Sequence, residues 1–136
     1  MSPHVSESTF LDYQVLHFSG EFDLSTQALL RAAFEQVITL PDCRVLLDLS
    51  ATTFLDCGAA RQLDVIAGSR LPEPVTVCPD GQVLRMLRMT GYVGLHRVVP
   101  TLMHAISPRP YDPVSEAWRR TVHVIPPAEG RARRPG

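Results

Sequence analysis

The sequence contains no lysine, so its 13 basic residues are all arginine, against 14 aspartate and glutamate residues. The formal net charge is −1, which argues against a dedicated nucleic-acid-binding protein, because such proteins have a basic excess. No apolar run approaches the roughly 18 residues that would suggest a membrane span. The N-terminus also lacks the basic and apolar regions of a secretory signal. We therefore expect a cytoplasmic protein that binds neither nucleic acid nor membrane.

Cysteine is scarce as well. The three cysteines are odd in number and widely spaced, which excludes a disulfide framework and favours a reducing compartment. None of the five histidines has the i, i+4 or Cys-x-x-Cys spacing of a metal site. The spacing suggests no Ser/His/Asp set, no phosphate-binding GxxxxGK[ST] loop and no GxSxG turn. We expect no metal, no cofactor and no enzymatic activity. The histidines are His4, His17, His96, His104 and His123.

Charge and proline are unevenly distributed along the chain. Residues 1–106 contain 7 arginines and 11 acidic residues, whereas residues 107–136 contain 6 arginines, 3 acidic residues and six of the 12 prolines. This contrast predicts one acidic folded domain over 1–106 and a Pro- and Arg-rich tail over 107–136 that is largely disordered. One apolar patch in the tail is a candidate for docking on the domain or on a partner: Trp118, Val122 and Ile125.

The first half of the domain reads as a hairpin followed by a helix. Residues 14–20 have the composition of a strand ended by glycine, and residues 5–10 are its expected antiparallel partner. Apolar residues then recur at helical spacing up to Pro41, and Asp23 or Ser25 is expected to cap the helix start. The predicted apolar stripe consists of Leu29, Leu30, Ala33, Phe34, Val37 and Ile38.

The remainder of the domain alternates between short apolar runs and amphipathic segments. Such alternation predicts an α/β fold whose parallel strands are joined by right-handed helical crossovers. We expect Gly91 to end one helix in a left-handed conformation and Thr101 to cap the last helix. The expected strands are 44–50, 74–78 and 96–100, and the expected helices are 58–70, 81–91 and 101–106.

Three segments together resemble the STAS domain of the anti-sigma factor antagonist type. "SGEFDLSTQALLRAAF" is similar to the family's Gly-Glu-apolar-Asp turn and first helix, and "VLLDLSATTFLDCGAARQL" to its strand, Asp-Ser-Ser-Gly joint and second helix. "LRMLRMTGYVGLHRVVPTLMHAI" is similar to its third helix, Thr-Gly cap, final strand and final helix. The resemblance covers about residues 5–106. It implies a four- to five-stranded mixed sheet with about four helices.

The resemblance also implies a function in partner switching. Members of the family bind an anti-sigma factor that has a histidine-kinase-like ATPase fold, and this binding frees a sigma factor. The anti-sigma factor can also phosphorylate a serine or threonine at the second-helix joint, after which the phosphorylated form dissociates. The implied partner-binding residues of this chain are Asp23, Ser25, Thr26, Asp56, Cys57, Gly58 and Ala59.

The joint at residues 56–59 departs from the family pattern. Asp56 matches the family's aspartate and Cys57 its first serine, but Gly58 occupies the position of the phosphorylated serine, and Ala59 replaces the usual glycine. Because glycine has no hydroxyl group, Gly58 is a degenerate phosphorylation site. The resemblance therefore implies binding that is controlled by protein amount and not by modification at this position.

Several residues at the joint have a second interpretation. Asp56 and Asp23 are equally explained as helix caps, since aspartate is common at helix starts. Cys57 is expected at a helix N-terminus, where the helix dipole favours the thiolate, so a redox switch is conceivable; a small residue in place of serine is the simpler interpretation. Cys78 ends a neighbouring predicted strand and is expected at the same end of the sheet.

Two further functions remain open from the sequence. A STAS domain without the phosphorylation site is suited to a scaffold subunit that assembles with other STAS proteins. A small-ligand or nucleotide-binding STAS module is the other alternative, although no residue pattern identifies its pocket.

Overall fold

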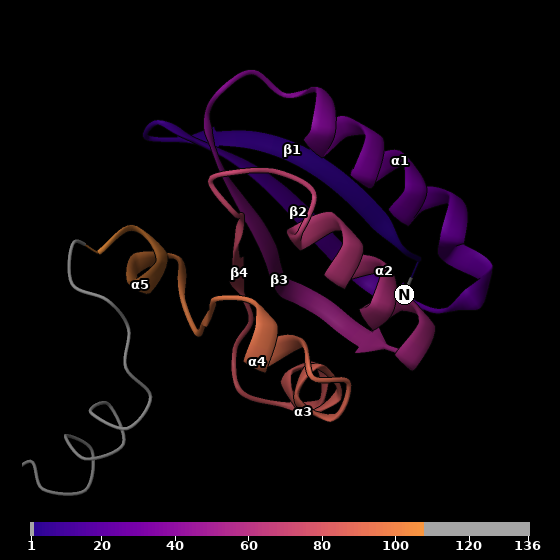
Figure 1. Cartoon of the computed structure of the whole chain (residues 1–136). Coiled ribbons are helices and arrows are strands. Elements are labelled where there is room, and N and C mark those ends of the chain that lie inside the picture. The colour runs from indigo at the N-terminus through magenta and orange to yellow at the C-terminus, as the bar shows by residue number, and fades with distance from the viewer. Residues whose placement is uncertain (1, 108–136) are drawn as a thin grey trace, which may run out of the picture. The chain divides into compact units, whose positions relative to one another are not determined.

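The computed structural model describes residues 2–107. Five strands form one mixed sheet, and five α-helices pack around it (Figure 1). The predicted α/β class and the STAS-type sheet are confirmed, with one more helix than the four expected. The strands are β1 (His4–Phe10), β2 (Tyr13–Phe22), β3 (Arg44–Leu55), β4 (Val75–Val77) and β5 (Val98–Val99). The α-helices are α1 (Gln27–Thr39), α2 (Cys57–Ala67), α3 (Gln82–Met89), α4 (Tyr92–Leu95) and α5 (Leu102–Ile106). The tail predictions, including Trp118, lie outside the described residues.

The sheet follows chain order, β1-β2-β3-β4-β5. β1 pairs with β2 in antiparallel register from His4↔Ser19 to Phe10↔Tyr13, which confirms the predicted hairpin. The remaining neighbours pair in parallel, as expected from the alternation of strands and helices. The carboxyl ends of the parallel strands therefore lie along one edge of the sheet, where the segments that follow them can meet.

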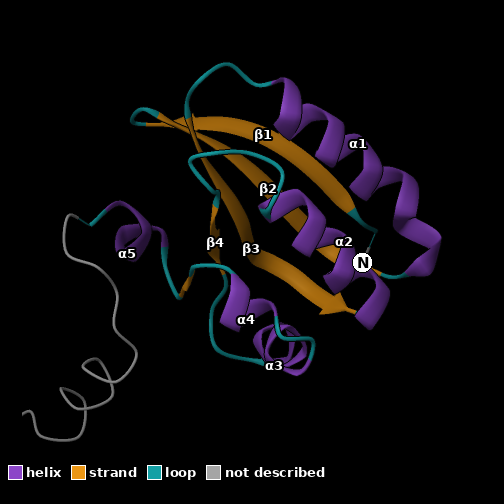
Figure 2. Ribbon diagram, in the orientation of Figure 1, coloured by secondary structure: helices purple, strands orange, loops and turns teal. Residues whose placement is uncertain are grey.

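The main core lies between one face of the sheet and α1 to α4. Figure 2 shows α1 and α2 over this face, while α5 lies on the opposite side of β4. Leu16 and Phe18 of β2 and Leu47 of β3 pack there against Leu63 and Ile66 of α2, all almost fully buried. The neighbouring strand residues His17 and Asp48 point to the other face, because side chains alternate along a strand.

The predicted helix faces are mostly correct. Val83, Leu84 and Leu87 of α3 are buried, as expected, but the stripe predicted for α1 is too wide. Leu30, Ala33 and Val37 are buried, whereas 36% of Leu29 and 47% of Ile38 remain exposed. Helical periodicity gives the direction of the apolar stripe, but the packing of α2 against one side of α1 sets its width.

Gly20 and Gly91 are two of the three described glycines whose positive φ favours glycine. Gly91 has φ +83°, which is the predicted left-handed end of α3. Gly20 in β2 has φ +91°, and a Cβ placed there would lie 2.4 Å from the carbonyl oxygen of Ser2. Gly20 thus allows the N-terminal backbone to cross directly over β2, just before the turn into α1.

Candidate functional site

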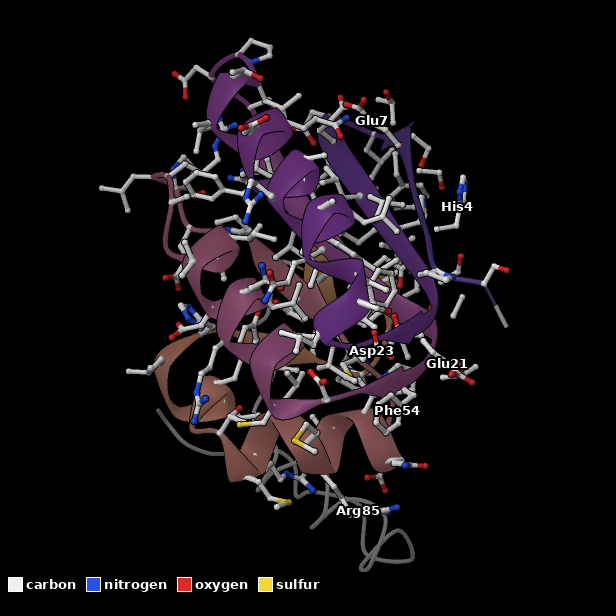
Figure 3. The ribbon with its side chains drawn as sticks, turned by 90° about the vertical axis from the view of Figure 1, so that its right-hand side faces the viewer. His4, Glu7, Glu21, Asp23, Phe54 and Arg85 are labelled. Carbon is white, nitrogen blue, oxygen red and sulfur yellow. The ribbon has the colours of Figure 1, made fainter. Side chains whose placement is uncertain are left out.

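Two of the three segments that resemble the family, those that contain Asp23 and Asp56, meet at the carboxyl ends of β2 and β3. Phe22, the last residue of β2, is in register with Leu55, the last residue of β3. The backbone N–H of Asp56 also donates to the carbonyl oxygen of Phe22 at 3.1 Å. Asp23 and Asp56, which are 33 residues apart in sequence, therefore begin adjacent segments. Figure 3 shows Asp23 and Phe54 along the same edge of the molecule, with Arg85 of α3 below them.

Asp56 is the N-cap of α2. Its Oδ1 accepts a hydrogen bond from the backbone N–H of Ala59 at 2.8 Å, and its own carbonyl accepts the first helical bond, from the N–H of Ala60 at 2.9 Å. An N-terminal carboxylate also faces the positive end of the helix dipole. The predicted capping role of Asp56 is confirmed, and it fixes the direction in which α2 leaves the sheet edge.

Asp23 caps a short 3-10 turn, Leu24–Thr26, that precedes α1. Its Oδ1 accepts from the N–H of Ser25 at 2.9 Å and from the Ser25 hydroxyl at 2.6 Å. The hydroxyl of Thr26 accepts from the N–H of Asp23 at 3.0 Å, which holds the turn from both ends. Asp23 therefore caps the turn that leads into α1, whereas Ser25 donates to Asp23 and caps nothing. The N-cap of α1 itself is Thr26, which makes no side-chain capping bond, so the prediction is correct for Asp23 only with respect to the turn.

Solvent reaches only part of the predicted partner-binding set. Ser25, Cys57 and Gly58 are exposed, and Asp23 and Asp56 are half-buried. The other two members of the set, Thr26 and Ala59, are buried, so their side chains support the joint from inside and offer no surface to a partner.

Two apolar side chains at this edge escaped the sequence analysis. Leu24, within the 3-10 turn, is 70% exposed, and Phe54 near the end of β3 is half-exposed. An apolar residue between the capping residue Asp23 and the polar residue Ser25 is the signal that could have indicated Leu24. The edge therefore combines exposed apolar side chains with partly exposed carboxylates that cap the adjacent turns, a composition suited to contact with another protein.

Comparison with known proteins identifies the family. A family model described as "STAS domain" matches residues 7–105. The chain belongs to the STAS domain family. A solved anti-sigma factor antagonist from Mycobacterium paratuberculosis shares 26% identity with this STAS domain at a TM-score of 0.69, covering 77% of this chain and 92% of that one. Unphosphorylated SpoIIAA, an anti-sigma factor antagonist, aligns at 15% identity and a TM-score of 0.44 over 88% and 97% of the two chains. None of the curated protein sequences matches significantly.

The cysteines of this STAS domain differ in their surroundings. Cys57 is exposed at the first position of α2, whereas Cys78 is buried directly after β4, and neither forms a disulfide. Burial raises the pKa of the Cys78 thiol to about 12. Cys78 therefore stays protonated at neutral pH, which makes it a poor partner for thiolate chemistry with Cys57.

Within residues 2–107 no cluster of three histidine, cysteine or acidic side chains could hold a metal ion, and no helix there is long and apolar enough to cross a membrane. Sequence spacing suggested no Ser/His/Asp set, but strand pairing brings Ser8, His17 and Asp48 into hydrogen-bonding contact. Chain spacing could not show this set, because its members come from three different strands.

Proposed function

We propose that this STAS domain is an anti-sigma factor antagonist that binds a cytoplasmic anti-sigma factor of the histidine-kinase-like ATPase type. The observation that supports this most is the 26% identity and TM-score of 0.69 to an anti-sigma factor antagonist over 92% of that protein's chain. The residues that match the STAS family model, 7–105, include both aspartate joints of this edge. Binding there would sequester the anti-sigma factor and release its sigma factor.

The proposed contact surface is the edge at the start of α2 and the 3-10 turn. Leu24 would supply the apolar centre, since it presents the most exposed large side chain at this edge. Cys57 and Gly58 lie on the exposed first turn of α2 and would form the flat part of the surface. Asp23 and Asp56 would act mainly through the backbone geometry that they fix, with Ser25 at the rim.

Because of Gly58, binding at this surface would not be switched off by phosphorylation at this position. A phosphoserine at this position would add about −1.5 to −2 charges and three acceptor oxygens, which disrupts a packed partner. Glycine cannot accept the phosphoryl group, so the complex would persist while ATP is present. The backbone itself still has room for a side chain: a Cβ on Gly58 would meet only Oδ1 of Asp56, at an ordinary 3.6 Å.

The test uses purified full-length protein and each histidine-kinase-like anti-sigma factor encoded in the same genome, with ATP throughout. We expect one of them to form a complex that survives prolonged incubation. Gly58→Ser should bind at first, become phosphorylated at residue 58 and then dissociate. Gly58→Ala is the matched control, because it adds the same Cβ atom as serine but no hydroxyl group. This variant should stay bound.

Two outcomes would contradict the proposal. Absence of binding to every such anti-sigma factor would favour a scaffold that assembles with other STAS proteins. Release of the wild-type protein with phosphate on Thr52 or Thr53 would mean that the switch has moved to a neighbouring hydroxyl. The second result is disfavoured for Thr52, which is buried and donates its hydroxyl to the carbonyl of Phe18 at 2.7 Å.

A further inference from the structure

Ser8, His17 and Asp48 form a continuous hydrogen-bonded chain across three adjacent strands. The Ser8 Oγ lies 2.7 Å from Nε2 of His17, and Nδ1 of His17 lies 2.8 Å from Oδ2 of Asp48. His17 and Asp48 are register partners in β2 and β3, while Ser8 of β1 lies diagonally opposite His17, beside its register partner Val15. Long side chains reach such diagonal neighbours across a sheet. These three hydrogen-bonded side chains lie on the sheet face opposite α1 and α2.

The hydrogen-bond partners determine where each proton lies. One oxygen of Asp48, Oδ1, accepts from the N–H of Ser50 at 3.0 Å and from its hydroxyl at 2.6 Å, which leaves Oδ2 for His17. A carboxylate can only accept, so Nδ1 of His17 carries its proton toward Asp48. In the neutral ring Nε2 then has the free lone pair, and the Ser8 hydroxyl donates to it.

This arrangement is that of a serine next to an oriented general base. The side chain of Asp48 is 15% exposed and that of His17 is 37% exposed, so the carboxylate is partly shielded while the imidazole remains accessible. Ser8 itself is exposed on β1, the edge strand of the sheet. An acyl donor can therefore reach the serine oxygen without any rearrangement of the sheet.

We propose that Ser8 is a nucleophile that accepts an acyl group from an activated acyl donor, a thioester or an aryl ester. The Ser8 oxygen forms a bond to the acyl carbon while Nε2 of His17 takes the hydroxyl proton. The bond from the acyl carbon to the sulfur or aryl oxygen breaks, and the leaving group receives that proton from His17. The products are an acyl ester on Ser8 and a free thiol or phenol. Asp48 acts as a positioning residue.

The proposed acylation site is separate from the proposed partner-binding edge. Ser8, His17 and Asp48 lie within the strands, whereas the edge is formed by the joints that follow β2 and β3. Positioned general-base assistance contributes about 10²–10⁴-fold to such a transfer. The open strand surface favours a single acylation of the protein over rapid turnover, because a substrate is not enclosed there as in a cleft.

The experiment treats the full chain with p-nitrophenyl acetate and, separately, with an acetyl thioester, and locates acetyl groups by peptide mass spectrometry. The absence of lysine simplifies the readout, since lysine side chains are the usual competing amines. We expect one dominant acetyl ester on Ser8. Ser6→Ala is the matched control, because Ser6 is exposed on the same face of β1 but is not the serine bonded to His17. It should be acetylated at the wild-type rate.

Variants of the base test the mechanism while Ser8 stays in place. His17→Ala should lower the acetylation rate of Ser8 about 10²-fold or more, and added imidazole should restore acetyl-Ser8. Asp48→Asn should lower the rate with an unchanged melting temperature, and Asp48→Glu should recover part of it. Each of three results would overturn the proposal: acetyl groups spread equally over exposed serines, acetylation of Ser8 undiminished in His17→Ala, or no acetyl-Ser8 at all.

Discussion

The N–H of Asp56 donates to the carbonyl oxygen of Phe22, so the residue that begins α2 is tied directly to the end of β2. This bond extends the β2–β3 pairing by one step beyond the Phe22↔Leu55 register. The 3-10 turn that follows β2 and the first turn of α2 consequently lie side by side. The proposed binding edge is therefore a product of sheet pairing.

The cap and the proposed partner contact of Asp56 can be separated by substitution. Asp56→Ala removes the acceptor of the Ala59 N–H and should lower the free energy of unfolding by about 1 kcal/mol. Asp56→Asn retains a side-chain oxygen of the same position, and asparagine caps as well as aspartate, so its stability should stay close to wild type. Urea denaturation measures both.

Binding by the Asp56→Asn variant then decides the role of the charge. If its affinity for the anti-sigma factor equals that of the wild type, Asp56 serves the edge only as a cap. A loss of affinity at unchanged stability would show that the carboxylate itself contacts the partner. A strongly destabilised Asp56→Asn protein would contradict the capping argument.

Gly20 should tolerate no side chain. Gly20→Ala forces an L-residue to φ +91° and places Cβ 2.4 Å from the carbonyl oxygen of Ser2. The unfavourable backbone conformation alone costs about 1–2 kcal/mol, and displacement of the N-terminal segment adds to it. We expect a clear fall of the melting temperature. Gly94→Ala is the control, because a Cβ there meets no atom within 4 Å, and alanine is the better helix former.

Deletion of residues 1–3 separates the two causes at Gly20. In the shortened protein the contact with Ser2 no longer exists, so Gly20→Ala should be less destabilising there than in the full chain. An equal penalty in both backgrounds would show that the backbone conformation, and not the crossing segment, makes glycine necessary.

The sequence predicted best those features that depend on neighbours along the chain. The β1–β2 hairpin, the cap at Asp56 and the left-handed Gly91 are local, and all three were correct. Features that depend on register were missed, since a shift of one residue along a strand exchanges its two faces. The Ser8–His17–Asp48 chain is the clearest case, because it needs an antiparallel and a parallel register at the same time.

Arg70 should be essential to the carboxyl end of α1. Its two terminal nitrogens donate to four backbone carbonyls, one in the last turn of α1 and three in the segment that follows it. Hydrogen bonds to a charged group contribute about 1.5–3 kcal/mol, and Arg70→Met should lower stability by about that amount. The carbonyls belong to Val37, Leu40, Pro41 and Cys43, at 2.9, 3.5, 2.8 and 3.1 Å.

Arg70→Lys should have a stability between those of the wild type and Arg70→Met, because one ammonium group cannot reach all the carbonyls that a planar guanidinium bridges. Arg85→Met on the exposed side of α3 is the control and should change the free energy of unfolding by less than about 0.5 kcal/mol. Denaturant titrations of the three variants give the order directly. Equal losses for Arg70→Met and Arg85→Met would disprove the role of Arg70.

Cys78 and Tyr92 should make the fold sensitive to alkaline pH. Burial raises the pKa of Cys78 from 9.0 to about 12, and burial likewise raises the pKa of Tyr92 above its usual 10.0, against the smaller effect of its hydrogen bond with Thr76. Well below pH 9 the folded and unfolded chains both retain these protons, and these two groups do not affect stability. Above pH 9 the unfolded thiol ionises while the folded thiol does not, so stability falls as the pH rises toward 12.

Urea denaturation at a series of pH values checks the sign and the assignment. Wild-type stability should decline from pH 9 upward, and more steeply above pH 10, where unfolded tyrosine also ionises. Cys78→Ala should flatten the decline between pH 9 and 10, and Tyr92→Phe should flatten only the part above pH 10. Both variants lower stability at neutral pH as well, so the comparison rests on the slope against pH. A slope unchanged in Cys78→Ala would mean that the thiol ionises equally in both states, and would contradict the assignment of the decline to the burial of Cys78.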